Sequence, residues 1–446
     1  QGYAANEIET GVYEVVAGNV LNETKNIKYA TLAEAIAAAD PGNTIKLLAD
    51  ITENVTVDKK LTIDGDGHNS TGLISTNKNV TYTFKNFNID GANSYFVKVT
   101  GGGGNYVFDN CNIKNSWGLI YTNKSTNTVS VKNSIVDNCE YGVAHFTALN
   151  SATLENVTVQ NSARGLMVQN QAAKTIKFVG CNISATEPVY IWDKGTYIIT
   201  LNFEGENTFD GELGVSTTTY GKLVLTTADA TLTAPAGLNV TTSVAGHIVD
   251  YADGKYYLRV PNYVAAIGET KYESLQAAID AAVDNDEIVV IDNIEVTIDD
   301  LAGLQLVGTK YPSYYVVRGK TISIDLNGKT INANVTATDM LLGLFSTEQN
   351  GNLTLKDSIN GNGKVEIVAT DDADVYSLIT NYDSSSAITI DGGNYILNKV
   401  GDSGQSLIYD SPGNMVVNGG NFYLGNLGQG VGNVNENGIP WIFNVK

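Results

Sequence analysis

The chain has 446 residues, of which 43% are hydrophobic and only 17% are charged, so it can bury a large interior but is too long for one small core. Its 48 acidic and 27 basic residues give a net charge of −21, which argues against binding to nucleic acids or anionic membranes. Abundant glycine (45) and scarce proline (7) favour strands and turns. No apolar run reaches the length of a transmembrane helix, and three cysteines are too few to hold the fold through disulfides.

A repeat at an offset of 243 residues divides the chain into two modules, which we place at 1–252 and 253–446. Twelve residues of the stretch 10–51 recur at this offset without a gap. The two modules are therefore expected to begin with the same arrangement of elements.

Each module opens with a short amphipathic helix, expected at about 31–39 and 274–282. Thr31 and Ser274 occupy the N-cap positions, and leucine, alanine and isoleucine form one apolar stripe. We expect each helix to cap the stack of strands in its own module, because an uncovered apolar end strand invites aggregation.

Residues 62–68 read TIDGDGH, a spacing of acidic residues and glycines that is also found in calcium loops. The counterpart in the second module is 325–328, DLNG. Both copies keep Asp, then Asp or Asn, then Gly, which is what a tight turn requires. Ser75 stands where an EF-hand needs an acidic ligand. We predict a turn without a metal, and a calcium site is the alternative.

A shorter repeat occupies residues 80–235 of the first module. It begins with FKNFNI (84–89) and recurs every 23–25 residues, which is too regular for loops and too short for domains. Its third position is always Asn or Gly, the residues that best tolerate a left-handed backbone, so we expect a bend there with side chains stacked from coil to coil. The third positions are Asn86, Asn110, Asn133, Asn156, Gly180 and Gly205.

One strand, a bend and a further strand in each repeat make one coil per repeat. The sequence thus resembles the right-handed parallel β-helix proteins of the pectin-lyase-like superfamily. The opening ATLAEAIAAADPGNTIKLLADIT is similar to that of bacterial cell-surface adhesin-type β-helix proteins. The resemblance implies an all-β, right-handed parallel β-helix, a solenoid of two tandem modules with longer, irregular coils in the second. Since this fold supports lyases, hydrolases, tailspikes and adhesins alike, it does not choose a function.

A column of large side chains precedes the glycines of successive coils when the coils are aligned on Gly118, Gly142, Gly165 and Pro188. Exposed aromatic rings at coil spacing form a ridge or groove on which sugar rings can lie, and Arg and Glu can hold the hydroxyl groups. The alternative is ordinary stacking that stabilises the coils. The predicted ligand-binding residues are Trp117, Tyr141, Phe146, Arg164, Glu187, Tyr190 and Trp192.

Residues suited to catalysis are sparse. The three histidines are scattered, so neither a His-rich metal site nor a Ser-His-Asp triad is expected. We predict that His145 is structural, facing inward or towards a corner, in register with Tyr121, Val168 and Ile191. Arg164 is the best candidate for the basic residue of a lyase, but one arginine is weak support.

The sequence predicts a non-catalytic, secreted or cell-surface, adhesin-like bacterial protein with no cofactor and no metal. Its expected partner is a glycan or a host surface molecule, and not a nucleic acid or a membrane. A polysaccharide lyase or glycoside hydrolase of the β-helix fold is the first alternative, and a structural surface stalk is the second. The start at Gln1 is expected for an exported chain whose signal peptide has been removed, or for a trimmed one. The oligomeric state stays open.

Overall fold

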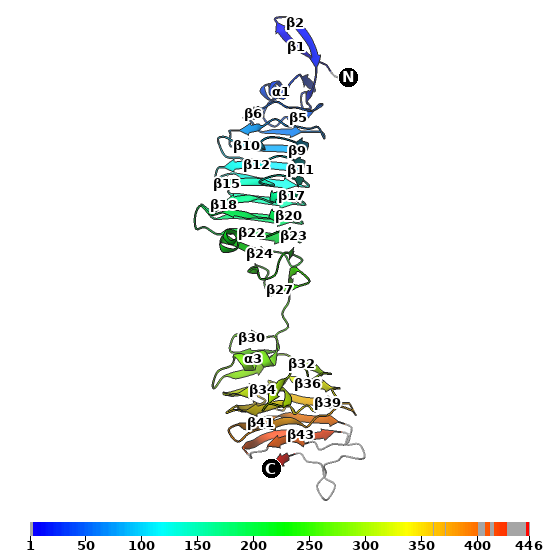
Figure 1. The fold of residues 1–446 in the computed structure, drawn as a ribbon, viewed down its shortest axis with the longest axis vertical. Coiled ribbons are helices and arrows are strands. Elements are labelled where there is room, and N and C mark those ends of the chain that lie inside the picture. The colour runs from blue at the N-terminus through cyan, green and yellow to red at the C-terminus, as the bar shows by residue number, and fades with distance from the viewer. Residues whose placement is uncertain are drawn as a thin grey trace. The chain divides into compact units, whose positions relative to one another are not determined.

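The computed structural model describes residues 3–359, 361–370, 372–399, 406–410, 414–425 and 443–445. The chain divides into two compact units, unit 1 (Gln1–Val260) and unit 2 (Pro261–Lys446). Each unit is built mainly from stacked parallel strands (Figure 1).

The boundary of unit 1 falls eight residues beyond the expected end at residue 252. The reason is a closing hairpin, in which β27 (Ile248–Ala252) pairs antiparallel with β28 (Lys255–Arg259). β28 also pairs antiparallel with β25 (Thr231–Thr233), so the hairpin belongs to the first unit.

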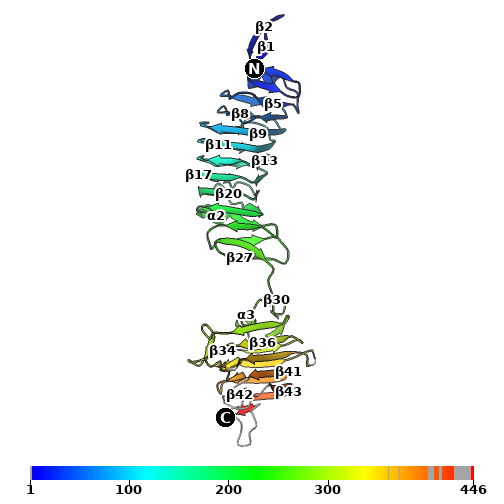
Figure 2. The same cartoon turned by 90° about the vertical axis from the view of Figure 1, so that its right-hand side faces the viewer.

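The strands of unit 1 form columns along the stack, and most neighbours in a column are parallel (Figure 2). One column is a seven-stranded sheet of β6 (Val55–Val57), β8 (Ile74–Thr76), β10 (Tyr95–Val99), β12 (Gly118–Asn123), β15 (Ala144–Ala148), β18 (Met167–Gln169) and β21 (Tyr190–Trp192). A second column contains β5 (Thr44–Leu47), β7 (Leu61–Asp64), the first halves of β9 (Thr81–Asp90) and β11 (Asn105–Lys114), β13 (Thr128–Lys132), β16 (Ser151–Glu155), β19 (Lys174–Val179), β22 (Ile199–Glu204), β24 (Gly221–Leu225) and β26 (Val240–Thr242). A third column contains the second halves of β9 and β11, then β14 (Ile135–Asp137), β17 (Thr158–Arg164), β20 (Asn182–Glu187), β23 (Glu206–Asp210) and β25. The remaining elements are β1 (Tyr3–Glu9), β2 (Val12–Ala17), β3 (Val20–Asn22), β4 (Ile27–Tyr29), α1 (Leu32–Ala38) and α2 (Val215–Tyr220).

The short repeat of the sequence sets the register of these columns, as predicted. The first repeat positions pair directly from coil to coil: Phe84, Phe108, Val131, Leu154, Phe178 and Phe203. All six are buried, and the rings of Phe84 and Phe108 stack with centroids 5.2 Å apart. The interior of unit 1 is therefore a set of apolar columns, and each side chain rests on its equivalent in the next coil.

The third repeat positions are bends, as predicted, because all six adopt a left-handed φ between 49° and 62°. The side-chain amides link neighbouring coils: Asn110 Nδ2 donates to Asn86 Oδ1 at 3.0 Å, and Asn156 Nδ2 donates to Asn133 Oδ1 at 3.3 Å. Between these two pairs Asn133 donates instead to Asp109 Oδ1 at 2.9 Å. Each of these three asparagine side chains therefore donates a hydrogen bond to the preceding coil, forming an amide ladder, and the acceptor is an asparagine except at Asn133, where it is Asp109.

A second amide ladder, which the sequence analysis missed, follows five residues after the first. Asn115, Asn138 and Asn161 also have left-handed φ values near 50°. Asn138 Nδ2 donates to Asn115 Oδ1 at 2.8 Å, and Asn161 Nδ2 donates to Asp137 Oδ1 at 2.8 Å. The bends before and after the strands of the third column are therefore both held by hydrogen bonds that asparagine side chains donate to the neighbouring coil.

The TIDGDGH stretch is a turn after β7. Asp64 Oδ1 accepts from the Asp66 N–H at 2.9 Å and from Asn86 Nδ2 at 3.0 Å, and Lys85 Nζ lies 2.9 Å from Asp64 Oδ2. Burial raises the pKa of Asp64, but the hydrogen bonds from Asn86 and Lys85 outweigh it and hold the pKa below its usual value. A Cβ at Gly65 would lie 2.6 Å from the Asn86 carbonyl oxygen, so this position needs glycine.

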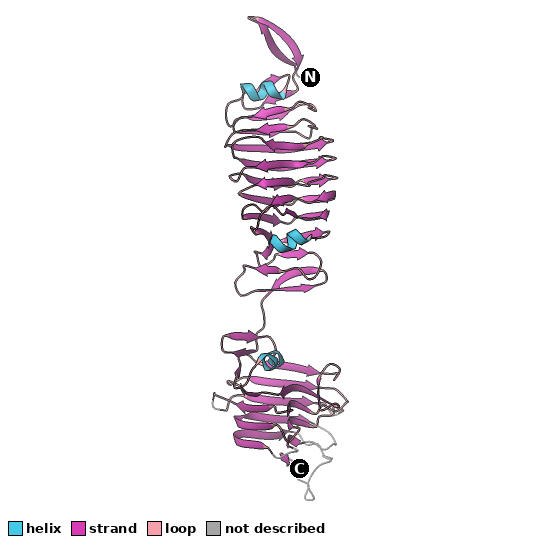
Figure 3. Cartoon of the chain, turned by 60° about the vertical axis from the view of Figure 1, so that its left-hand side comes forward, coloured by secondary structure: helices cyan, strands magenta, loops and turns pink. Residues whose placement is uncertain are grey.

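Helices α1 and α3 (Leu275–Ala281) open the two units (Figure 3). Thr31 forms a capping box with Glu34, and the Ser274 hydroxyl accepts from the Ala277 N–H. A lysine from a later segment caps the other end of each helix: Lys59 Nζ donates to the Ala39 carbonyl at 3.1 Å, and Lys320 Nζ to the Ala282 carbonyl at 2.8 Å. α1 packs on β3–β6 and α3 on β29–β31 and β34, the opening strands of their own units.

Unit 2 has two sheets of stacked strands. The first contains β29 (Ala265–Ile267), β30 (Thr270–Tyr272), β31 (Glu287–Val290), β32 (Ile294–Ile298), β35 (Thr321–Asp325), β36 (Thr330–Val335), β38 (Asn352–Lys356), β39 (Lys364–Ala369), β41 (Ala387–Lys399) and β43 (Met415–Gly425). The second contains β33 (Gln305–Val307), β34 (Tyr311–Arg318), β37 (Gly343–Glu348), β40 (Ser377–Asn381), β42 (Ser406–Asp410) and β44 (Phe443–Val445). Val316, Ser346, Thr380 and Tyr409 pair in turn, so successive coils are 30, 34 and 29 residues long. These coils are longer and less regular than those of unit 1.

The amide ladder generates a stability prediction at Asn133. Asn133→Ala should lower the free energy of unfolding by about 2–3 kcal/mol, because alanine is strained in a left-handed bend and loses the amide hydrogen bonds. Asn133→Gly should cost about 1 kcal/mol, because glycine tolerates the bend and loses only those bonds. Urea unfolding followed by circular dichroism measures both. Asn123→Ala, at an exposed asparagine that ends β12, is the control and should change little; equal losses for Ala and Gly at Asn133 would contradict the backbone argument.

Candidate functional site

Six of the seven predicted binding residues lie together where the third column meets the seven-stranded sheet of unit 1. Trp117 and Tyr141 precede β12 and β15, and their ring centroids are 6.5 Å apart. Arg164 ends β17, and its guanidinium lies 4.6 Å from the ring centroid of Tyr190 on β21. The cluster extends to Glu187 at the end of β20 and to Trp192 at the end of β21.

The predicted outward orientation of Phe146 is wrong. Its side chain is fully buried and pairs with Val168 in the interior of the coil. His145 is the outward residue of this strand and pairs with Tyr121 and Met167, so its expected alignment with Val168 is also wrong. Tyr121 and His145 face outward and stand three residues after the glycines of their coils. In the next coil the outward residue is Met167, which stands two residues after Gly165. This one-residue difference exchanges the two faces of the strand.

Tyr95 is the centre of the cluster, and sequence reasoning missed it. It is 5% exposed, and its ring centroid lies 5.7 Å from Trp117, 5.5 Å from Tyr121 and 5.8 Å from Tyr141. Its hydroxyl is 2.9 Å from His145 Nδ1. Tyr95 pairs with Gly118, so it occupies the position at which the next coils were aligned on a glycine. The coil of Tyr95 has no glycine there, and the alignment therefore missed it. We define the aromatic face as Tyr95, Trp117, Tyr121, Tyr141, His145, Tyr190 and Trp192.

The rings of the aromatic face are held by one another. The imidazole of His145 stacks on Tyr141 at 5.2 Å and approaches Trp192 at 6.1 Å. Trp117 is 47% exposed, whereas His145 is 9% exposed. The buried rings therefore form a base that supports partly exposed ones at the surface.

Charged side chains border the aromatic face at one end. Arg164 lies between Tyr141 and Tyr190, 5.7 Å and 4.6 Å from their centroids, and its Nε is 3.5 Å from Glu187 Oε2. Lys194 Nζ lies 4.3 Å from the ring centroid of Trp192. The face thus offers flat rings together with donors and acceptors for hydroxyl groups.

The two buried polar groups at the centre stay neutral at pH 7. Burial, and to a smaller extent the positive charge of Arg164, lowers the pKa of His145 to about 4. Burial also raises the pKa of the Tyr95 hydroxyl. The base of the aromatic face is therefore uncharged, and charge enters only at its border.

Two hollows accompany this surface. One of about 330 Å³ borders Trp117 and is lined by polar side chains that include Asn138 and Glu140. Another of about 560 Å³ lies over the outward amides of Asn88 and Asn112 in the third column. The first hollow adjoins the exposed tryptophan and extends the aromatic face, whereas the second has no aromatic lining.

The described residues contain no group of three or more His, Cys, Asp or Glu side chains placed to hold a metal ion. All three cysteines are free and buried, and burial raises the pKa of Cys139 to about 11. None of the described helices is long and apolar enough to cross a membrane.

The stacked parallel columns define a parallel β-helix. Residues 52–233 match the family described as the right-handed beta helix region, and this part of the chain is a right-handed β-helix. The match includes the whole aromatic face and both amide ladders. The comparisons with curated proteins and with solved structures found no match.

The lowered pKa of His145 predicts a pH dependence of stability. Between pH 6.5 and about 4 the unfolded chain binds a proton at this histidine that the folded chain does not, so the free energy of unfolding should fall as the pH falls through this range. Denaturant unfolding at pH 7.5, 6, 5 and 4 should show a smaller loss for His145→Gln than for the unchanged chain. His247→Gln is the control and should keep the original slope; an unchanged slope in His145→Gln would show that this imidazole is not held neutral.

Proposed function

We propose that unit 1 binds carbohydrate through the aromatic face and does no chemistry on it. The observation that carries the proposal is the continuous layer of rings on neighbouring coils, with Trp117 exposed and Arg164 and Glu187 at the border. Sugar rings stack on aromatic faces through their C–H groups, and their hydroxyls need donors and acceptors nearby.

The dimensions support an oligosaccharide ligand. Trp117 and Trp192 belong to the first and last of four successive coils, and coils are about 4.8 Å apart, so these two rings are roughly 15 Å apart along the stack. This length fits about three sugar units. The bordering charges of Arg164, Glu187 and Lys194 suit a ligand rich in hydroxyl groups or one with a carboxylate.

The arrangement of Arg164 supports binding in preference to catalysis. A lyase needs a base beside the substrate, but Arg164 is stacked on two tyrosine rings and paired with Glu187. Ring stacking gives about 1 kcal/mol per aromatic, so a single site is weak and works best in many copies. We therefore propose a secreted or surface-attached bacterial adhesin-like protein that recognises a glycan or a glycosylated host molecule.

The proposal predicts the effect of removing Trp117, which is exposed, and Trp192, which is half-buried. The double substitution Trp117→Ala with Trp192→Ala should weaken binding to the glycans that the unchanged chain retains on a glycan array by roughly 30-fold, from about 1 kcal/mol per ring. The thermal midpoint should change little, because Trp117 is 47% exposed and Trp192 lies at the edge of the cluster. Tyr197→Ala, at an exposed tyrosine outside the aromatic face, is the matched control.

Two results would reject the proposal. Unchanged glycan binding in the double variant would exclude the aromatic face as the site. Release of unsaturated or reducing sugars by the unchanged chain, lost in Arg164→Gln, would show that the protein is an enzyme.

A further inference from the structure

We propose that unit 2 carries a second, separate saccharide site, a cavity of about 540 Å³ that accepts a neutral sugar ring. The cavity lies on the second sheet of unit 2 and is lined by Tyr311, Met340, Leu342, Tyr376, Tyr382 and Tyr409. We call it the tyrosine cavity. It adds a site to the proposed function and rests on the same stacking chemistry, with different residues.

The four tyrosines form two pairs of rings. Tyr311 and Tyr382 have centroids 6.1 Å apart with an interplanar angle of 53°, and Tyr376 and Tyr409 have centroids 5.0 Å apart at 78°. Tyr311, Tyr376 and Tyr382 pack against a small apolar cluster that is separate from the main core of the unit and consists of Val307, Val316 and Leu342. Four half-buried phenol rings around an apolar base offer ring faces for stacking and hydroxyls for hydrogen bonding.

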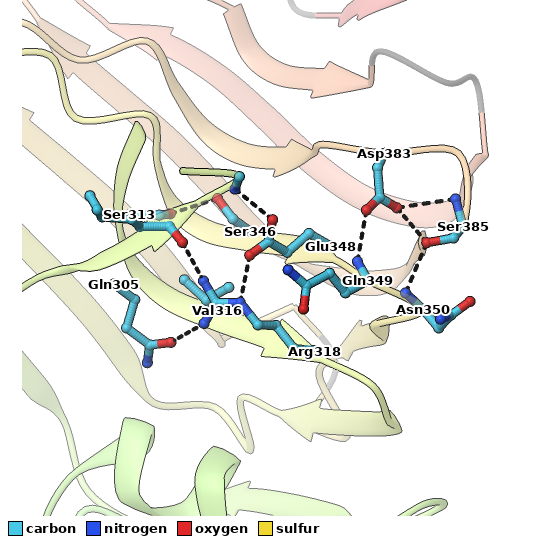
Figure 4. Close-up of polar contacts among 12 residues, drawn as sticks. Gln305, Ser313, Val316, Arg318, Ser346, Glu348, Gln349, Asn350, Asp383 and Ser385 are labelled. Carbon is cyan, nitrogen blue, oxygen red and sulfur yellow. Dashed lines mark hydrogen bonds and ion pairs between the residues drawn. The ribbon is translucent and has the colours of Figure 1, made fainter. Parts of the chain in front are cut away.

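A buried ion pair fixes the turn that precedes Tyr311 (Figure 4). Glu348 is 2% exposed, and its carboxylate accepts from Arg318 Nε at 2.5 Å and from the Gly308 N–H at 2.6 Å. Gly308 has φ +65°, and a Cβ there would lie 2.9 Å from the Tyr382 hydroxyl. Arg318 and Glu348 therefore hold the backbone of this turn directly against Tyr382.

The turn after Tyr382 is fixed in the same way. Asp383 accepts from the Gln349 N–H and from the Ser385 hydroxyl, both at 2.7 Å, as Figure 4 shows. Burial raises the pKa of Asp383, but these hydrogen bonds outweigh it and keep the pKa below its usual value. The carboxylate is therefore charged at pH 7 and ties the turn after β40 to the segment after β37, in the neighbouring coil. The rings are held in place before any ligand arrives, which lowers the entropic cost of binding.

The lining of the tyrosine cavity indicates a neutral ligand. None of its six lining side chains is charged at pH 7, and burial raises the pKa of the Tyr376 hydroxyl. A carboxylate or ammonium group would lose its hydration without gaining a partner among them. A neutral hexose, with a flat apolar face and several hydroxyls, matches this lining. Lys310 Nζ lies outside the lining, 5.5 Å from the ring centroid of Tyr311, whereas Arg164, Glu187 and Lys194 border the aromatic face of unit 1.

The test uses the full chain with the unit 1 site removed by Trp117→Ala and Trp192→Ala. Saturation-transfer NMR titrations with cellotriose, maltotriose and mannotriose should show that at least one neutral trisaccharide still binds, and that trigalacturonate binds more weakly. Adding Tyr376→Ala should weaken the neutral sugar about fivefold or more, as expected for one stacked ring. Tyr376→Phe keeps the ring and should lose less. Tyr423→Ala, at a tyrosine that is 51% exposed on β43, is the matched control and should leave affinity unchanged.

Distinct outcomes overturn the two proposals. If none of the neutral trisaccharides binds the tryptophan double variant, or if Tyr376→Ala and Tyr409→Ala leave affinity unchanged, the tyrosine cavity is not a saccharide site. The unit 1 proposal is judged separately by the glycans lost in the tryptophan double variant. Thermal unfolding of each variant checks folding, and Tyr376→Phe provides the readout where the alanine variant is unstable.

Discussion

Register between successive coils is the constraint on which the rest of the structure depends. Every parallel pair in unit 1 brings a residue next to its equivalent from the preceding coil, about 4.8 Å away. Apolar residues then stack into columns such as Phe84 on Phe108, and bend residues stack into amide ladders such as Asn110 on Asn86. A polar group at a bend thereby finds its partner in the next coil, which lets the chain turn sharply without leaving amides unpaired.

Most of this register could be predicted from the sequence, because a repeat of 23–25 residues maps directly onto coils. The bends at Asn86 and its equivalents were predictable for the same reason, since only Asn and Gly occupy the position. The faces of the seven-stranded sheet were less predictable. The glycines before its strands do not stand at a constant distance from the outward residue, so Phe146 was assigned to the wrong face. The helix caps formed by Lys59 and Lys320 could not be predicted from the repeat, because each lysine is far in sequence from the helix end to which it donates.

Coil stability, the alternative interpretation of the aromatic column, accounts for the buried members of the cluster, and the ligand-binding proposal rests on the exposed ones. Tyr95 and His145 are buried and hydrogen-bonded to each other, so their contribution is to packing. Trp117 packs edge-on against Tyr95 but keeps nearly half of its surface exposed. Rings supported in this way lose little conformational freedom on binding, which favours recognition of weakly held ligands such as sugars.

The same principle separates the aromatic face of unit 1 from the tyrosine cavity of unit 2. In unit 1 the register holds rings of neighbouring coils in a row, whereas in unit 2 Tyr376 and Tyr382 flank the same strand β40, and Tyr409 pairs with Thr380. What differs is how the charges contact the rings: Arg164 stacks on Tyr141 and Tyr190 and pairs with Glu187, whereas Arg318 pairs with the buried Glu348 and Lys310 Nζ lies 5.5 Å from the ring centroid of Tyr311. Arg164 contacts the rings of its site directly, whereas the three nitrogens of Arg318 donate to Glu348, Gln305 and the Leu306 carbonyl within the protein. Under the two proposals the sites would prefer saccharides of different charge, which gives the chain a range of ligands that neither site has alone.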